Sequence, residues 1–152
     1  MTTTAAPTGI VPLLRAAGAV HDFIESKLTA VGLSIPRLAA LERLADAGGV
    51  LPLGQLADRL SCVKSNVTQL VDRLEADGLV ARELDPTDKR SCLAVMTDAG
   101  RRAREAGARV QRDAEDQLFE PLSAEDRDRL AGLIEKLNGP LSVARVPARA
   151  GP

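Results

Sequence analysis

Apolar residues recur along the first part of the chain with the three- and four-residue spacing of an α-helix. Residues 8–30 carry one such stripe over about five helical turns, made up of Ile10, Leu13, Leu14, Ala17, Val20, Ile24 and Leu28. A second helix is expected to begin at Ser34, whose hydroxyl can accept free backbone N–H groups, and to end before Gly48 and Gly49. The segment 8–48 is therefore predicted to hold N-terminal helices that support the molecule and take part in dimerisation.

The next pattern is two amphipathic helices separated by a very short break. Residues 52–60 form a short apolar stripe and residues 63–77 a longer one, with Ser61 and Cys62 between them. Gly78 stands where a left-handed residue commonly ends a helix. The outward face of the longer helix is polar and consists of Lys64, Ser65, Asn66, Thr68 and Gln69. This pattern predicts a helix-turn-helix.

Two strand-like segments follow the helix-turn-helix directly. Residues 79–84 and 91–96 have strand composition. The loop between them reads Asp85-Pro86-Thr87-Asp88-Lys89-Arg90, which is polar and turn-forming. We therefore expect a β-hairpin with a charged tip, the usual form of a wing.

Two further helices are predicted after the hairpin. Thr97 and Ser123 are both suitable N-caps, and they open helices over residues 98–120 and 123–138. Gly139 and Pro140 are expected to end the last helix, and residues 140–152 are expected to form a disordered tail. The predicted fold class is mostly α with a small β-hairpin wing. A winged helix-turn-helix at 50–97 is joined to a helical dimerisation region from both chain ends, 8–48 and 98–139.

The exposed polar face of the longer helix suits the major groove of DNA, where short side chains can reach base edges. Ser65, Asn66, Thr68 and Gln69 suit base edges or phosphates, and Lys64 and Arg73 suit phosphates. At the hairpin tip, Lys89 and Arg90 are placed to reach phosphates or an adjacent minor groove. Asp88 is expected to orient the Arg90 guanidinium by a charge-assisted hydrogen bond.

Composition narrows the classes of function. The chain has 152 residues, 45% of them hydrophobic and 27% charged, with a net charge of −1 that does not by itself indicate a nucleic-acid binder. No glycine-rich phosphate loop, nucleophile elbow or two-histidine metal motif occurs, so neither an enzyme nor a cofactor is expected. One histidine and two dispersed cysteines are too few to hold a metal ion, so no metal site is expected. Without a secretion signal or membrane span, the expected compartment is the cytosol, with reduced thiols.

The motifs together resemble those of one known family. LADRL at residues 56–60 and VTQLVDRLEADGLV at residues 67–80 resemble the helix-turn-helix of MarR-type transcription regulators. DPTDKR at residues 85–90, closed by MTDAG at residues 96–100, is similar to that family's wing signature. One departure lies at Val63, because the family usually has Ser or Thr there and valine cannot cap a helix.

The resemblance implies a homodimer on a pseudo-palindromic operator, with recognition helices in successive major grooves. It implies repression that is relieved by a small phenolic or lipophilic ligand or by thiol oxidation. Arg90 would take the minor-groove role with Asp88 bracing it, and residues 64–69 with Arg73 would face the major groove and backbone. A ligand cleft between the dimerisation and DNA-binding regions is also implied, with His21, Ile24 and Leu38 as candidate lining residues.

Two alternatives remain open at the level of sequence. A thiol-oxidation sensor would use Cys62 or Cys92, although free cysteines are more often small buried apolar residues. A winged-helix module that binds protein and no longer reads DNA would have a neutral or acidic wing. Lys89 and Arg90 argue against that second alternative.

Overall fold

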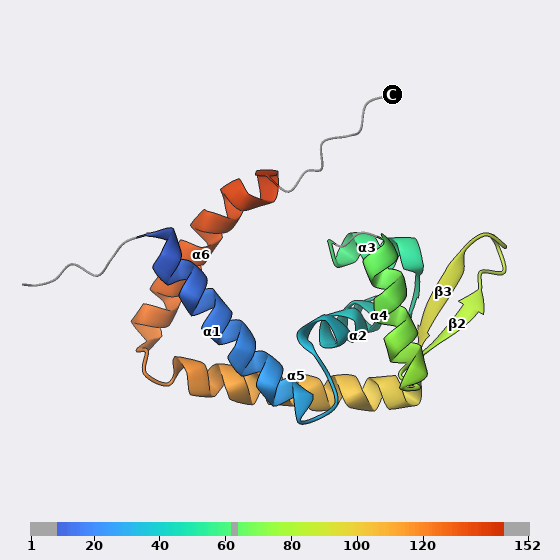
Figure 1. The fold of residues 1–152 in the computed structure, drawn as a ribbon, viewed down its shortest axis with the longest axis horizontal. Helices are drawn as coiled ribbons and strands as arrows, with labels where there is room; N and C mark the ends of the chain where they lie inside the picture. The colour runs from blue at the N-terminus through green and yellow to red at the C-terminus, as the bar shows by residue number, and fades with distance from the viewer. Residues whose placement is uncertain (1–8, 62–63, 145–152) are drawn as a thin grey trace, which may run out of the picture. The chain divides into compact units, whose positions relative to one another are not determined.

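The computed structural model describes residues 9–61 and 64–144 and is mostly helical with a small antiparallel sheet (Figure 1). The first elements are α1 (Ile10–Thr29), α2 (Ile35–Asp46), β1 (Val50–Pro52), α3 (Leu53–Arg59) and α4 (Lys64–Ala76). They are followed by β2 (Val80–Leu84), β3 (Cys92–Met96), α5 (Asp98–Phe119) and α6 (Ala124–Ala144). This confirms the predicted fold class, a helix-turn-helix followed by a β-hairpin wing.

Three helix starts lie where the sequence predicts them, because each has a hydroxyl cap. The Ser34 Oγ accepts the Arg37 backbone N–H at 3.4 Å. The Thr97 Oγ1 accepts the Gly100 N–H at 3.0 Å, and the Ser123 Oγ accepts the Asp126 N–H at 3.1 Å. Each cap satisfies a backbone donor that the helix itself leaves free.

The sheet has one strand more than the sequence predicts. Its order is β1-β3-β2, with Val50 opposite Val95 and Val80 opposite Met96. The segment Val50–Pro52 is only three residues long and ends in a proline, so it carries no alternation from which a strand can be read. The predicted helix over 52–60 accordingly begins one residue later, at Leu53.

The chain divides into two compact units, residues 1–114 and 115–152. The first unit holds the core, in which α2, α3, α4 and the sheet contribute fully buried side chains. These include Leu41, Leu44, Leu56, Val67, Val71, Leu74, Val80, Ala94 and Met96. Because Val67, Val71 and Leu74 lock one face of α4 into this core, the opposite face of α4 must point to solvent.

The helices at the chain ends keep much of their apolar surface exposed. In α1 only Leu28 is buried, and the rest of the predicted stripe from Ile10 to Val20 is open to solvent. In the second unit, α6 continues to Ala144 with Pro140 inside it, so the predicted end at Gly139 is wrong. Proline removes one backbone hydrogen bond but does not stop the helix here. Residues 145–152 of the predicted tail lie outside the described residues.

Candidate nucleic-acid interface

The outward face of α4 is polar along the first half of the helix. Ser65, Asn66, Thr68 and Gln69 are all exposed, while Val67 between them is 1% exposed. Arg73 is exposed in the last turn. Lys64 is the first residue of α4, and its side chain lies outside what the structure describes. The face carries short donors and acceptors on a helix that the core holds in place, as base reading requires.

The turn that precedes α4 is described only in part. Ser61 follows α3 with a positive φ of 52°, which ends that helix by a left-handed residue. Cys62 and Val63 lie outside the described residues, so the departure from the family pattern at Val63 stays untested. The described part of α4 begins at Lys64, and the predicted start at Val63 lies outside the described residues.

The wing loop is ordered by its own aspartates. The Asp85 carboxylate accepts the Thr87 backbone N–H at 2.9 Å and the Thr87 hydroxyl at 2.7 Å, and these hydrogen bonds lower the pKa of Asp85. The Asp88 carboxylate accepts the backbone N–H of Arg90 at 3.0 Å. Asp88 therefore orders the loop around Arg90, whereas the sequence predicts a bond to the guanidinium. An aspartate reaches a backbone N–H two residues ahead more easily than a long side chain that points outward.

Helix α4, which we call the recognition helix from here on, meets the wing at a hollow of about 480 Å³. It is lined by Pro52, Leu53, Gly54, Gln55, Asp58, Thr68, Arg90, Ser91 and Cys92. Two predicted DNA-contacting residues from separate elements, Thr68 of α4 and Arg90 of the wing, thus border the same open depression. Arg90, Lys89 and Asp88 are exposed at the loop. The start of α3 also borders this depression, which the sequence did not single out.

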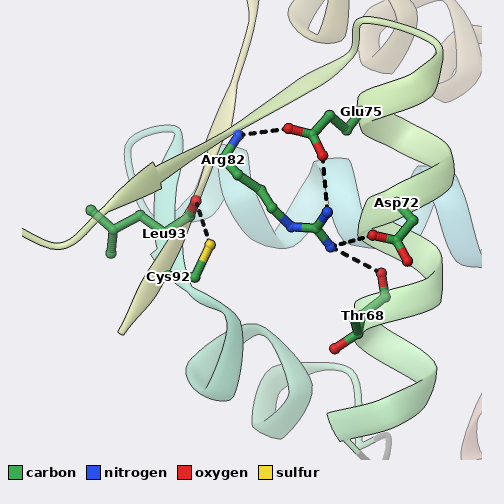
Figure 2. Close-up of polar contacts among 6 residues, drawn as sticks. All are labelled: Thr68, Asp72, Glu75, Arg82, Cys92 and Leu93. Carbon is green, nitrogen blue, oxygen red and sulfur yellow. Dashed lines mark hydrogen bonds and ion pairs between the residues drawn. The ribbon is translucent and has the colours of Figure 1, made fainter. Parts of the chain in front are cut away.

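Arg82 of β2 fastens the wing to α4, as Figure 2 shows. Its guanidinium donates to Glu75 Oε2 at 2.9 Å and to the Thr68 carbonyl oxygen at 3.3 Å, and it pairs with Asp72 Oδ1 at 2.5 Å. Its backbone N–H also donates to Glu75 Oε1 at 3.3 Å. One side chain therefore fixes the position of the hairpin along three successive turns of the recognition helix.

The same clamp shapes the charge of the surface. The hydrogen bond to Asp72, followed by the charges of Asp72 and Glu75, raises the pKa of Arg82, so the guanidinium stays protonated. It neutralises the two carboxylates and so reduces the negative charge on this side of α4. Sequence reasoning missed this role, although a signal exists. Arg82 shares strand parity with buried Val80, and a charge on an inward-facing strand position needs a partner.

The three candidate ligand residues lie at different depths. Leu38 is buried, Ile24 is half-buried, and His21 is exposed beside Asp22, with 3.4 Å between His21 Nδ1 and Asp22 Oδ1. None of the three lines the hollow between α4 and the wing. Leu38 packs close to Gly107 of α5, where an added Cβ would lie 2.9 Å from Leu38 Cδ1.

The thiol of Cys92 belongs to the wing, because Cys92 is the first residue of β3. Cys92 is half-buried in β3, with its Sγ 3.9 Å from the Leu93 carbonyl oxygen (Figure 2). Cys62 lies outside the described residues. Over residues 9–61 and 64–144, no group of three metal-ligating side chains occurs. Within the same ranges, no helix is both long enough and apolar enough to cross a membrane.

Comparison with known proteins agrees with this geometry. Residues 31–91 match the sequence model of the MarR family. The chain is 35% identical over 105 residues to an uncharacterized HTH-type transcriptional regulator, YkoM of Bacillus subtilis, covering 69% of this chain and 68% of that protein. A probable transcriptional regulator from Pseudomonas aeruginosa superimposes with a TM-score of 0.75 at 31% identity, over 86% of this chain and 97% of that chain.

Several of the similar structures contain DNA. A mutant of MarR from Escherichia coli, solved in complex with operator DNA, superimposes with a TM-score of 0.73 at 26% identity, over 84% of this chain and 94% of that chain. The helix-turn-helix, the wing and these relatives lead to one conclusion: this chain belongs to the MarR family of transcription regulators.

Proposed function

We propose that the protein is a homodimeric repressor that binds a pseudo-palindromic operator through α4 and the wing, and that a small molecule releases it. The observation that carries the proposal is the shared hollow, where Thr68 of the recognition helix and Arg90 of the wing border one depression. A duplex that places its major groove against α4 would bring its backbone along this depression. The E. coli relative solved in complex with operator DNA supports the proposal that this chain binds an operator.

The proposed contacts divide by chemistry. Ser65, Asn66 and Gln69 would read base edges, because they are uncharged and can both donate and accept. Lys64, Thr68, Arg73 and Lys89 would contact phosphates and fix the register, and Arg90 would enter the minor groove. Asp88 serves indirectly, since it orders the backbone of the loop that presents Arg90.

The exposed apolar surface of the helices at both chain ends supports the proposed dimer. Ile10 and Leu14 of α1 are 71% and 62% exposed, and Leu133 and Leu141 of α6 are 58% and 61% exposed. Monomeric proteins rarely leave such continuous apolar stripes open. A second copy of this chain would cover them and would place two recognition helices on two operator half-sites, about 34 Å apart.

The proposed effector is a small phenolic or lipophilic molecule that binds between the dimerisation helices and the DNA-binding elements. His21, Ile24 and Leu38 remain the candidate lining residues, with Leu38 and Ile24 supplying apolar surface and His21 a polar contact. The protein is proposed to act in the cytosol, where it meets the chromosome. No catalytic step is proposed.

Fluorescence anisotropy on DNA from upstream of the protein's own gene tests the proposal, with scrambled DNA alongside and a salt series for both. We expect sequence-preferring binding that weakens steeply with salt. Arg90→Ala should weaken operator binding about 10- to 100-fold, as expected for a lost arginine contact in a groove. Arg43→Ala removes the same charge from an exposed residue of α2 and should leave binding unchanged.

The outcomes separate the alternatives. Equal and weak binding of operator and scrambled DNA, repeated with fragments selected from the genome, would favour a protein-interaction module. Phenolic compounds are then added to the operator complex, followed by peroxide. Release by peroxide alone, abolished by Cys92→Ser or Cys62→Ser, would assign control to thiol oxidation instead of a ligand.

A further inference from the structure

Arg37, in the first turn of α2, contacts residues outside its own helix. Its Nη1 donates to the Gly32 carbonyl oxygen at 2.8 Å, in the loop between α1 and α2. Its Nη2 pairs with the Asp77 carboxylate, 40 residues further along the chain. The side chain is only 17% exposed, and within the described residues its Nε has no acceptor. The two Nη contacts therefore hold the guanidinium in place.

Asp77 occupies the corner where the recognition helix ends. The next residue, Gly78, has a left-handed φ of 70°, and the N–H groups of Gly78 and Leu79 return to α4 at 2.9 Å each. The carbonyl oxygen of Gly78 accepts the Thr97 hydroxyl at 2.7 Å, and that of Leu79 accepts the Thr97 backbone N–H at 3.1 Å. The end of α4, the start of β2 and the start of α5 are thus joined at one point, and Arg37 ties that point to the loop between α1 and α2.

This corner lies at the end of α4 opposite to the residues proposed to read bases. Ser65 precedes Asp77 by 12 residues, which corresponds to about 18 Å along a helix. A tilt of α4 by about 5° around the corner would move its first turn by roughly 1.5 Å. Hydrogen bonds to base edges do not survive a shift of that size, whereas contacts between flexible cations and phosphates do.

We propose that Arg37 is a positioning residue for sequence-specific DNA binding: its ion pair with Asp77 sets the angle at which α4 enters the groove. The inference rests on the proposed function, since it assumes that α4 reads DNA. Arg37 itself lies beside the far end of α4 and does not contact the duplex. The guanidinium suits this task because its rigid fork can hold a backbone carbonyl and a carboxylate at once, which an ammonium group does less well.

The test compares Arg37→Gln, Asp77→Asn and the double variant, measured as affinity for operator and for scrambled DNA. The two single changes alter charge in opposite directions, so a purely electrostatic effect would weaken DNA binding in one and strengthen it in the other. A positioning role predicts that both weaken operator binding by about tenfold, the loss of a base contact, and scrambled DNA by less than about twofold. The double variant should be no weaker than the weaker single variant, because the two side chains act as a pair.

Two controls accompany these variants. Arg43→Gln removes the same charge from the same helix, where Arg43 pairs with neighbouring Asp46 at 3.2 Å, and should leave both affinities unchanged. Arg37→Lys keeps the charge and should recover part of the operator preference. The salt dependence should be the same for Arg37→Gln and wild type, since no phosphate contact is lost. Circular dichroism confirms that each variant is folded.

Opposite effects of Arg37→Gln and Asp77→Asn would overturn the inference, as would an unchanged ratio of operator to scrambled affinity in both. If the wild-type protein binds operator and scrambled DNA equally well, that separate result contradicts the proposed function. Amide exchange decides the inference in that case. Faster exchange at Gly78 and Leu79 in Arg37→Gln than in Arg43→Gln would show that the ion pair holds the end of α4, and equal exchange rejects the inference.

Discussion

Arg82 is a residue at which stability and DNA binding should fail together. Its contacts with Asp72, Glu75 and the Thr68 carbonyl hold the wing against α4. We expect Arg82→Gln to lower the free energy of unfolding by about 1–2 kcal/mol, the value of partly exposed charge-assisted bonds. Operator affinity should fall by at least about tenfold, because the wing would lose its tie to α4 and two carboxylates would be left uncompensated beside the proposed DNA-binding face. Urea denaturation and anisotropy measure the two effects.

Arg82→Lys separates the charge of this residue from its geometry. Lysine neutralises the carboxylates but lacks the fork that reaches three acceptors. It should restore more of the DNA affinity than of the stability. If Arg82→Gln bound operator as tightly as wild type, the wing would not need this clamp to be positioned.

The Asp85 carboxylate predicts how the wing loop responds to acid. Hydrogen bonds from the Thr87 hydroxyl and N–H lower the pKa of Asp85 below its ordinary value of 3.8. A lowered folded pKa stabilises the ordered loop at pH values above the ordinary pKa, and this contribution is lost as pH falls through the lowered pKa. An NMR titration should show the Thr87 amide unchanged at neutral pH and shifting only in that acid range. Asp85→Asn should remove the transition, and a midpoint at or above the ordinary value would contradict the bonding described.

At the scale of elements, the sequence predicts helices well where caps and apolar stripes agree. Ser34, Thr97 and Ser123 begin the helices that their hydroxyls predict. The strand β1 could not be foreseen, since Val50–Pro52 becomes a strand only through pairing with β3, and such pairing is not local. At Pro140 the local sequence predicts a helix end that does not occur, because α6 continues past the proline to Ala144.

The side chain of Thr97 caps α5 and also binds the turn between α4 and β2, so its removal should lower stability. Its hydroxyl accepts the Gly100 N–H at 3.0 Å and donates to the Gly78 carbonyl oxygen at 2.7 Å. Thr97→Val keeps the shape and removes both bonds, so unfolding should require about 1–2 kcal/mol less than in wild type. Thr97→Ser retains the hydroxyl and should stay within about 0.5 kcal/mol of wild type. Denaturation is compared at one protomer concentration, and equal stability of the Val and Ser variants would show that the cap has no energetic role.

At the scale of the whole molecule, the sequence predicts the residues proposed to face DNA more readily than the residues that hold them in position. Exposed polar positions on α4 follow from periodicity, because Val67 and Val71 define the buried face. Arg37 and Arg82 act through partners that are 40 and 7 to 14 positions away, and no spacing rule predicts such pairs. The apolar stripes of α1 and α6 can be recognised in the sequence. The structure is needed to show that the core of the single chain leaves them exposed to solvent.

Those stripes lead to the prediction that dimerisation and operator binding fail together. Leu133 and Leu137 lie one turn apart on α6, and both are about half exposed or more. Lysine at both positions should change the particle mass from about twice 16.0 kDa to a single chain, as light scattering would measure. Operator affinity should then fall by about 100-fold or more, because the second half-site contact is no longer intramolecular. Leu84→Lys places a lysine on a more exposed apolar residue, in the wing, and should leave the mass unchanged. A wild-type protein that is monomeric at micromolar concentration, or a Leu133→Lys/Leu137→Lys variant that remains dimeric, would show that these helices do not form the interface.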